Sequence, residues 1–287
     1  MSHVNTHREP HRSRWGRVAS WVLLACVIAF IAFCLAWRLD GGRWERVETP
    51  SMGTVAPVGS LLWVKPVDFG SLRPGDFITF HPPGAGQTTY SHRVHKINAD
   101  GTLTTKGVIP APDPWRLTAS DVVGEVRMTW WGMGWLVAMA PVLLIGGLAV
   151  AGIRSLLGER WKLPATLVLG SLVLSIAFSI YRPFTNAQQL SFAPDQRGGA
   201  TATYVGTGLL PIRLEAAGGA SVVMNDGQLG TVHVTNADSD HKLRVGLKPA
   251  IPTWWWLGLV GICFLPGAYS LVVGLPRDDT EAEPEPA

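Results

Sequence analysis

The sequence predicts a membrane protein with four transmembrane helices and two small all-β domains outside the membrane. Three observations lead to this fold class. The chain of 287 residues is 47% hydrophobic and 16% charged, whereas soluble domains carry about 25% charged residues. Its apolar residues gather in four long runs. The two longest polar segments between these runs contain short alternating stretches and turn residues, which is typical of strands.

The four apolar runs have the length of membrane spans. A transmembrane helix needs about 20 apolar residues, and residues 18–37, 134–153, 163–181 and 254–273 meet this requirement. Tryptophans flank the first, second and fourth runs, as expected at a membrane–water interface. A cleaved leader is the alternative for the first run, with residues 34–36 as a weak cleavage site. Because the apolar core of a leader has only about 7–15 residues, we expect an uncleaved anchor.

Basic residues orient these runs in the membrane. Lys and Arg gather in the N-terminal tail (1–17) and in the loop 154–162, and Arg277 follows the fourth run in the acidic tail 274–287. Such segments stay on the cytoplasmic side, which places the polar segments 38–132 and 182–253 outside. We therefore expect a multi-pass protein of the cell membrane with the lipid bilayer as a partner. The net charge of +3 is too small to indicate nucleic acid binding, and no oligomeric state is predicted.

The first outside segment, residues 38–132, consists of short strands and turns. Helical periodicity is absent, and turn residues such as Arg73-Pro74-Gly75-Asp76 separate the runs. The predicted strands are residues 61–64, 77–80, 91–97, 102–105 and 122–128. We expect a small all-β domain, and this domain contains every candidate for catalysis.

The second outside segment, residues 182–253, also predicts short strands. They are residues 201–205, 212–214, 221–224, 231–234 and 243–245, and Asn225-Asp226-Gly227 predicts a hairpin turn. Strands at this spacing indicate a small sandwich. His233 and His241 are expected to be surface or packed histidines, and no cluster has the spacing of a metal site. No cofactor is expected.

The three cysteines carry no prediction of chemistry. Cys26, Cys34 and Cys263 all lie inside apolar runs, so no pair in the polar segments is available for a disulfide framework. We expect inert thiols in the core or facing lipid.

Ser51 is the candidate nucleophile of the first outside segment. It follows Pro50, which fixes the backbone before it. A serine hydroxyl needs a base to take its proton, and neutral imidazole suits that role near pH 7. Strand alternation places His92 and His95 on opposite faces, so only one of them reaches Ser51. Lys65 is a competing base for a Ser–Lys pair.

Six short blocks extend the pattern over residues 49–127. They are Ser51-Met52, residues 59–64, residues 72–80, His92-Arg93-Val94, Thr104-Thr105-Lys106-Gly107 with Pro112-Asp113-Pro114-Trp115, and residues 123–126. In order and spacing they resemble the type I signal peptidases, in the branch of the endoplasmic reticulum, archaea and Gram-positive bacteria, which has histidine in place of a lysine base. The resemblance implies a β-rich catalytic domain held against the membrane, with Ser51 as nucleophile and His92 as general base. His95 is then a bystander.

The resemblance also implies an acid that orients the imidazole. The family has Lys-Gly-Asp followed by a second aspartate, whereas here Val108 follows Lys106-Gly107. Asp113 matches the second aspartate and is the candidate, with Asp121 in reserve. A second departure is Gly53-Thr54, where the family has Glu-Pro after Ser-Met.

The expected function is that of a signal peptidase I-type serine endopeptidase, which removes signal peptides from exported preproteins at the outer membrane face. The alternative is a catalytically impaired relative that binds or escorts exported proteins, which the departures at Val108 and the second β domain favour. A transporter or channel is disfavoured, because the interiors of the four apolar runs contain no charged residue.

Overall fold

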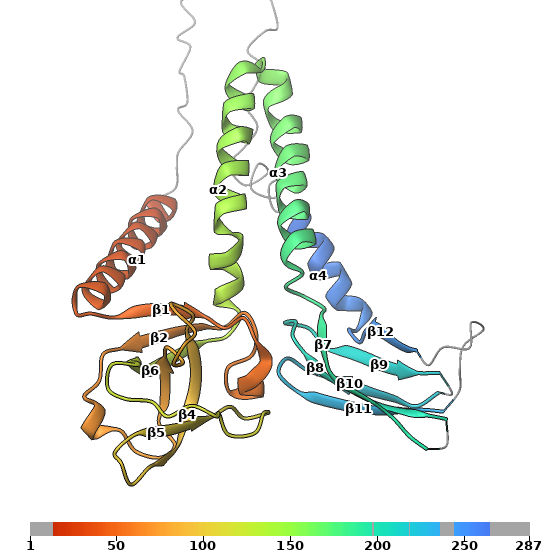
Figure 1. Ribbon diagram of the computed structural model, residues 1–287. Coiled ribbons are helices and arrows are strands. Elements are labelled where there is room, and N and C mark those ends of the chain that lie inside the picture. Colours follow the sequence, from red (N-terminus) through yellow and green to blue (C-terminus); the bar gives the residue numbers. More distant parts are fainter. Residues whose placement is uncertain (1–13, 197, 218, 236–243, 265–287) are drawn as a thin grey trace, which may run out of the picture.

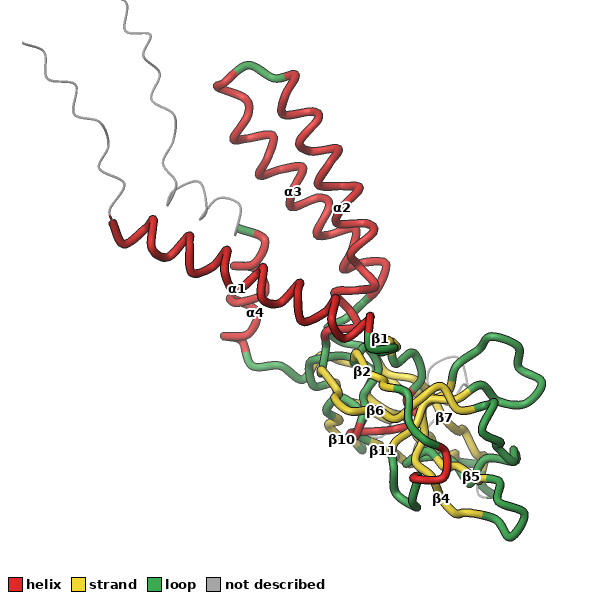
Figure 2. The backbone as a smooth tube through the Cα atoms, turned by 90° about the vertical axis from the view of Figure 1, so that its left-hand side faces the viewer, coloured by secondary structure: helices red, strands yellow, loops and turns green. Residues whose placement is uncertain are grey.

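The computed structural model describes residues 14–196, 198–217, 219–235 and 244–264 (Figure 1). Helix α1 (Arg14–Leu39) leads into a β region of residues 43–130, which we call the N-terminal β domain. Helices α2 (Met133–Leu156) and α3 (Glu159–Tyr181) form an antiparallel hairpin, followed by a second β region of residues 187–249, the C-terminal β domain, and by α4 (Thr253–Cys263). Both β domains lie at the same end of the α2–α3 hairpin (Figures 1 and 2).

The N-terminal β domain is one antiparallel six-stranded sheet in the order β1-β2-β6-β3-β4-β5. Three register shifts, at Trp63/Val64, Thr79/Phe80 and Val94/Lys96, bend and twist the sheet. Its elements are β1 (Arg43–Arg46), the 3-10 helix η1 (Pro50–Val55), β2 (Leu61–Lys65), the 3-10 helix η2 (Phe69–Ser71), β3 (Phe77–Phe80), β4 (Tyr90–Ile97), β5 (Leu103–Lys106) and β6 (Val122–Trp130). The predicted strands of this segment are present, and β1 was not predicted.

Two buried clusters hold this sheet together. One contains Met52 of η1 with residues of β2 and β3, so that the helix that carries Ser51 is fixed on the core. The other lies under β4 and β5 and contains Leu103 and Leu117. Each of these three side chains has 1% or less of its surface exposed. Apolar side chains buried this deeply stabilise the fold by about 1.5–3 kcal/mol each.

An aromatic cluster fixes the end of α1 to the outside of the sheet. Trp63 of β2 has its ring centroid 5.3 Å from that of Phe33 and 5.2 Å from that of Trp37, both on α1. Trp130 of β6 stacks against Phe30, also on α1, at 6.1 Å. The last turns of α1 therefore pack against the N-terminal β domain.

The β domains meet the helical hairpin at a buried junction. Trp135 and Met139 of α2 pack there with Ala177 of α3 and Val58 of the N-terminal β domain. Gly59 has φ +84° and lies so close that a Cβ atom would be 1.9 Å from the Trp135 Nε1 atom. Only glycine fits both this backbone conformation and this contact, which fixes the N-terminal β domain on the first turn of α2.

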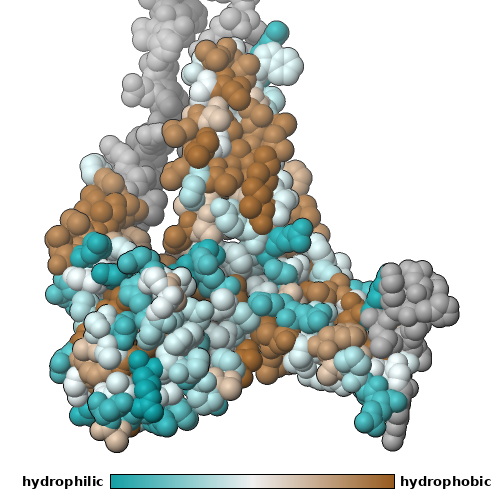
Figure 3. Space-filling view, in the orientation of Figure 1, coloured by the Kyte–Doolittle hydropathy of each residue, from teal (hydrophilic) through white to brown (hydrophobic). Residues whose placement is uncertain are grey.

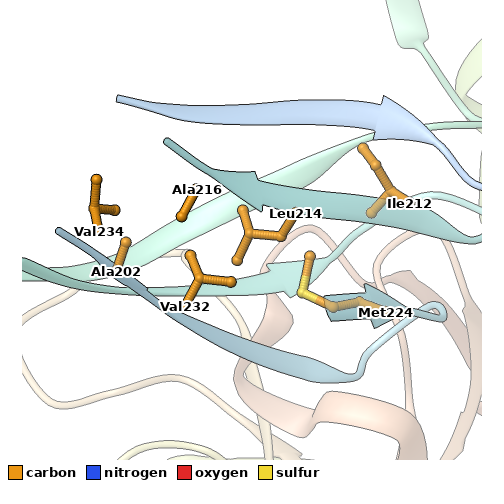
Figure 4. Packing of buried hydrophobic residues seen from close by; sticks show 7 residues of the cluster. All are labelled: Ala202, Ile212, Leu214, Ala216, Met224, Val232 and Val234. Carbon is orange, nitrogen blue, oxygen red and sulfur yellow. The ribbon is translucent and has the colours of Figure 1, made fainter. Parts of the chain in front are cut away.

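The C-terminal β domain is a sandwich of two three-stranded sheets, β10-β9-β12 and β11-β8-β7. Its strands are β7 (Ala187–Pro194), β8 (Ala200–Gly206), β9 (Ile212–Ala216), β10 (Ser221–Met224), β11 (Leu229–Val234) and β12 (Val245–Pro249). Figure 4 shows the core between the sheets, with Leu214 and Met224 at 0% exposure. Because β10 pairs with β9 and β11 with β8, the turn between them connects two sheets, and the predicted hairpin is wrong.

The predicted fold class with four transmembrane helices is wrong. Among the described residues, two helices, α2 and α3, are long and apolar enough to span a membrane. The apolar parts of α1 and α4, Leu24–Leu39 and Thr253–Ile262, have only 10–17 residues, against about 20 for a span. The chain combines helices with several small antiparallel sheets.

Part of the physical reason lies in α1, whose last turns pack against Trp63 and Trp130 of the sheet. An apolar run in the sequence does not distinguish such a surface from one that faces lipid. Four of the predicted features lie wholly or partly outside the described residues: positions 1–13 of the N-terminal tail, positions 265–273 of the fourth predicted span, the tail 274–287, and His241.

Candidate active site

Ser51 lies on η1, whose backbone is held close to the end of β5. Pro50 occupies the start of η1, and the helix is interrupted at Gly53, with φ +52° and ψ −132°. The Ser51 carbonyl accepts a hydrogen bond of 3.0 Å from the Ile109 N–H. A Cβ atom on Gly107 would lie 2.8 Å from the same carbonyl oxygen, so the glycine of the Lys106-Gly107 block permits this approach.

His92 lies on β4 and points into the domain. It pairs with Ile78 of β3 and is 3% exposed. The rings of Phe80 and Tyr90 lie edge-on to it, with centroid distances of 6.2 and 6.1 Å. His95 is exposed at the register shift of the same strand, as the alternation of strand residues predicts.

The three predicted site residues lie in one hydrogen-bonded chain. His92 Nε2 is 2.9 Å from Ser51 Oγ, and His92 Nδ1 is 2.6 Å from Asp113 Oδ2. An ionised carboxylate only accepts hydrogen bonds, so Nδ1–H is the donor to Asp113. The lone pair of Nε2 then faces the serine hydroxyl, in the arrangement by which a Ser-His-Asp triad activates its serine.

Asp113 is fixed by its own backbone and by Thr105. Its N–H donates to the Thr105 carbonyl at 2.9 Å, and its Oδ2 atom accepts a 2.7 Å hydrogen bond from the Thr105 hydroxyl. The Asp113 side chain is 9% exposed, and Thr105 is fully buried. Thr105 therefore belongs to the site, although the sequence analysis gave it no role. The sequence does contain a signal for this role. Thr105 lies two residues after the apolar Leu103 on β5 and so shares its buried face, where a hydroxyl needs a hydrogen-bond partner.

The other candidates lie elsewhere. Lys65 forms an ion pair with Asp40 and lies over the Trp37 ring, whereas the Ser51 hydroxyl bonds to His92. Asp121 accepts hydrogen bonds from the N–H and the hydroxyl of Thr118 and thereby closes a turn. Val108, which occupies the position of the missing aspartate, is 49% exposed.

A cleft of about 530 Å³ opens beside the Ser51 hydroxyl. It lies between the segment that follows β1 and the start of β4, and the Thr89 hydroxyl donates to Glu45 Oε2 across it at 3.2 Å. The lining residues are Glu45, Arg46, Val47, Glu48, Thr49, Ser51, Met52, Leu62, Gln87, Thr88, Thr89, Tyr90, Ser91 and His92. Arg46 and Glu48 pair with each other, which leaves Glu45 as the carboxylate of the lining without a cationic partner there.

The part of the chain that the structure describes contains no group of three His, Cys, Asp or Glu side chains that could hold a metal ion. His233 of the C-terminal β domain makes a hydrogen bond of 2.7 Å to Asp195 at the surface. Cys26 and Cys34 are free thiols.

Comparisons with protein families and with curated proteins identify no relative of this chain. No protein-family model matches the chain, and no curated protein matches it. The functional interpretation therefore depends on the site geometry and on the resemblance of the sequence blocks.

Proposed function

We propose that this chain is a serine endopeptidase of the signal peptidase I type, which removes signal peptides from exported preproteins. One observation carries the proposal: the continuous hydrogen-bonded chain from Ser51 Oγ through the His92 imidazole to Asp113. It joins residues from three separate segments, and each link has a distance of 2.9 Å or less. Sequence blocks that resemble the type I signal peptidases supply the reaction class.

The proposed reaction begins with proton transfer from the Ser51 hydroxyl to His92 Nε2. Ser51 Oγ attacks the scissile carbonyl, and Asp113 stabilises the imidazolium that forms. His92 returns the proton to the leaving amine. Water then hydrolyses the acyl-enzyme with His92 again as base. Oxyanion stabilisation is assigned to N–H groups of the first turn of η1, including that of Ser51, since this turn has no side-chain cap.

The cleft supports an extended polypeptide as the substrate. β1 is an edge strand of the sheet, and residues of β1 and of the segment after it line the cleft opposite the start of β4. An extended segment can add to such an edge by main-chain hydrogen bonds. Met52 and Leu62, each 1% exposed, form part of the wall. Their bulk favours small substrate side chains next to the scissile bond.

The helical hairpin supports attachment to a membrane. At 1.5 Å per residue, the 24 residues of α2 extend about 36 Å, which is enough to cross a hydrocarbon core of about 30 Å. Side chains such as Leu144, Ile145 and Leu148 are about 70% exposed, and Figure 3 shows hydrophobic surface over the hairpin. Arg154 at the end of α2 and Arg160 and Lys162 at the start of α3 support a cytoplasmic location for this end of the hairpin, with both β domains on the opposite, extracytoplasmic side.

The decisive experiment compares Ser51→Ala with Ser91→Ala in the full chain. The substrate is a preprotein with an N-terminal signal peptide, in detergent or lipid vesicles, and mass spectrometry locates the cut. Ser91 lines the same cleft, but its hydroxyl bonds to Thr79 at 2.8 Å. We expect wild type and Ser91→Ala to remove the signal peptide and Ser51→Ala to leave it attached.

Equal cleavage by Ser51→Ala and wild type would exclude Ser51 as the nucleophile. If the wild type binds the preprotein without cutting it, and Ser51→Ala binds equally well, the chain is instead a binding or escort protein. That result would support the alternative interpretation of the sequence, a catalytically impaired relative that binds or escorts exported proteins.

A further inference from the structure

The turn between β10 and β11 contacts the helix that carries the nucleophile. Gly227, with φ +73°, lies against the peptide bond between Gly53 and Thr54. A Cβ atom on Gly227 would be 2.4 Å from the Gly53 carbonyl oxygen and 2.7 Å from the Thr54 nitrogen. Figure 1 shows the orange segment that contains η1 on the side of its domain that faces the C-terminal β domain. The two domains thus meet two residues after Ser51.

Backbone hydrogen bonds make this turn rigid. The Gly227 N–H donates to the Gly206 carbonyl of β8 at 2.8 Å, and the Gly206 N–H donates to the Gln228 carbonyl at 3.0 Å. The Gln228 side chain accepts a hydrogen bond of 3.0 Å from the Asn225 N–H. Since β8 is the central strand of its sheet, the turn is an extension of the sandwich core.

A second contact fixes the turn to the sheet of the N-terminal β domain. Trp131, directly after β6, donates from Nε1 to Asp226 Oδ2 at 2.8 Å. Asp226 is half-buried at the boundary between the domains. A hydrogen bond to a charged acceptor is stronger than one between neutral groups. The turn therefore has one polar and one steric contact with the domain that contains the active site.

The backbone around Ser51 is held on two sides, by the end of β5 and by the β10–β11 turn. On one side the Ile109 N–H holds the Ser51 carbonyl, and on the other Gly227 limits the movement of Gly53. Gly53 itself has φ +52°, a conformation that non-glycine residues rarely adopt. This accounts for the departure from the Ser-Met-Glu-Pro pattern of the type I signal peptidases: a side chain at residue 53 would be strained, and its Cβ atom would lie 3.3 Å from the Gly227 carbonyl.

We propose that the C-terminal β domain positions the nucleophile: its β10–β11 turn, through Gly227 and Asp226, holds η1 so that Ser51 Oγ stays within hydrogen-bond distance of His92. The catalytic part of this inference rests on the proposed function. Gly227 and Asp226 touch neither the hydroxyl nor the imidazole, so they are positioning residues. The sandwich, which the function otherwise leaves without a role, becomes a structural part of the active site.

The test compares Gly227→Ala with Gly219→Ala in the full chain. Both glycines occupy turns of the same domain with positive φ (+73° and +92°), but a Cβ atom on Gly219 meets nothing within 4 Å. The backbone strain is therefore matched, and only Gly227→Ala pushes on η1. Two readouts are needed: kcat and KM for signal-peptide cleavage, and hydrogen–deuterium exchange of the amides of residues 51–55.

For Gly227→Ala we expect faster amide exchange in residues 51–55 and a kcat lowered by about 10²-fold, with KM changed less than about threefold, because a small displacement of a nucleophile costs about this much. Gly219→Ala should match wild type in both. Trp131→Phe should shift both readouts in the same direction as Gly227→Ala.

Exchange that is the same in the two glycine variants would overturn the inference, and so would faster exchange of η1 with an unchanged kcat. The exchange comparison needs no substrate. If the wild type cleaves no preprotein, the proposed function fails, while the exchange of residues 51–55 still decides whether the turn holds η1.

Discussion

Among the described residues, each of the two β domains contains one histidine paired with one aspartate. In the N-terminal β domain His92 is 2.6 Å from Asp113, and in the C-terminal β domain His233 is 2.7 Å from Asp195. The distances are nearly the same, but the surroundings differ. The side chains of the first pair are 4% and 9% exposed, whereas those of the second are 49% and 32% exposed.

The comparison teaches that a His–Asp distance alone does not indicate a site. Among the described residues, the buried polar side chains of the N-terminal β domain are Ser60, Thr79, His92 and Thr105, against Thr207 alone in the C-terminal part. Burying polar groups costs stability unless they are hydrogen-bonded. His92 and Thr105 both bond to Asp113, so these buried polar groups satisfy one another in the hydrogen-bonded chain that includes Ser51.

The largest expected effect separates the two histidines. His92→Ala removes the proposed base and should lower kcat for signal-peptide cleavage by about 10⁴- to 10⁶-fold. His233→Ala removes a surface pair, so its kcat should stay within about twofold of wild type. Single-turnover cleavage assays measure both. A comparable loss in the two variants would mean that the effect arises from folding, and the difference between the two pairs would then have no functional meaning.

The next effect concerns the two carboxylates. Asp113→Asn should lower kcat by about 10³-fold, because an amide in this place no longer fixes the Nδ1–H tautomer of His92. Asp195→Asn is the matched variant of the exposed pair and should leave kcat unchanged. Unaltered kcat in Asp113→Asn would show that another group orients the imidazole, and that the His92–Asp113 hydrogen bond only contributes to packing.

A smaller effect is expected at Thr105, whose hydroxyl donates to Asp113. Thr105→Val keeps the shape of the side chain but removes one hydrogen bond to a buried carboxylate, at a cost of about 1–3 kcal/mol. We expect kcat to fall about 10-fold, with KM unchanged. Thr203→Val is the control, since the Thr203 hydroxyl bonds to that of Thr231 in an exposed part of the sandwich. A loss of thermal stability without a change in kcat would limit Thr105 to a structural role.

Much of the candidate site could be predicted from the sequence, because it lies in short blocks with fixed spacing. The contact expected between Ser51 and His92 is present. Strand alternation placed His92 and His95 on opposite faces, and the resemblance of the His-Arg-Val block selected His92. The catalytic roles stay a prediction until cleavage is measured. Lys65 could not be excluded from the sequence, since its distance from Ser51 depends on the order of strands in the sheet.

The fold was less predictable where elements that are distant in sequence pack together. Helices α2 and α3 follow directly from their apolar runs, whereas α1 ends on the aromatic face of the sheet, which no run length reveals. Strand β1 has the sequence Arg-Trp-Glu-Arg, without an apolar alternation. The Asn225-Asp226-Gly227 turn has the residues of a hairpin, but the strands that it connects belong to different sheets.

The smallest expected effect tests the boundary between the two domains. Burial raises the pKa of Asp226 to about 6 from its ordinary 3.8, against the hydrogen bonds from Trp131 and Gly227, which lower it. A raised carboxyl pKa stabilises the folded state only while the group is protonated. This contribution is complete below about pH 3.8 and is lost as the pH rises through about 6. No other ionisable side chain lines the pocket beside Asp226.

Asp226→Asn keeps an acceptor for Trp131 but removes the charge. We expect its Tm to exceed that of wild type by about 2–4 °C at pH 7.5, which corresponds to about 1 kcal/mol after solvent screening of this half-buried group, and to equal it below about pH 3.8. Asp100 is the control, because its pKa is shifted in the opposite direction: hydrogen bonds from the Thr102 hydroxyl and N–H lower the pKa of its carboxyl. Its charged form is the stabilising one, so Asp100→Asn should lower the Tm at pH 7.5. A shift of the same sign in both variants would indicate a response to net charge, and the pH dependence would then say nothing about the contact between the domains.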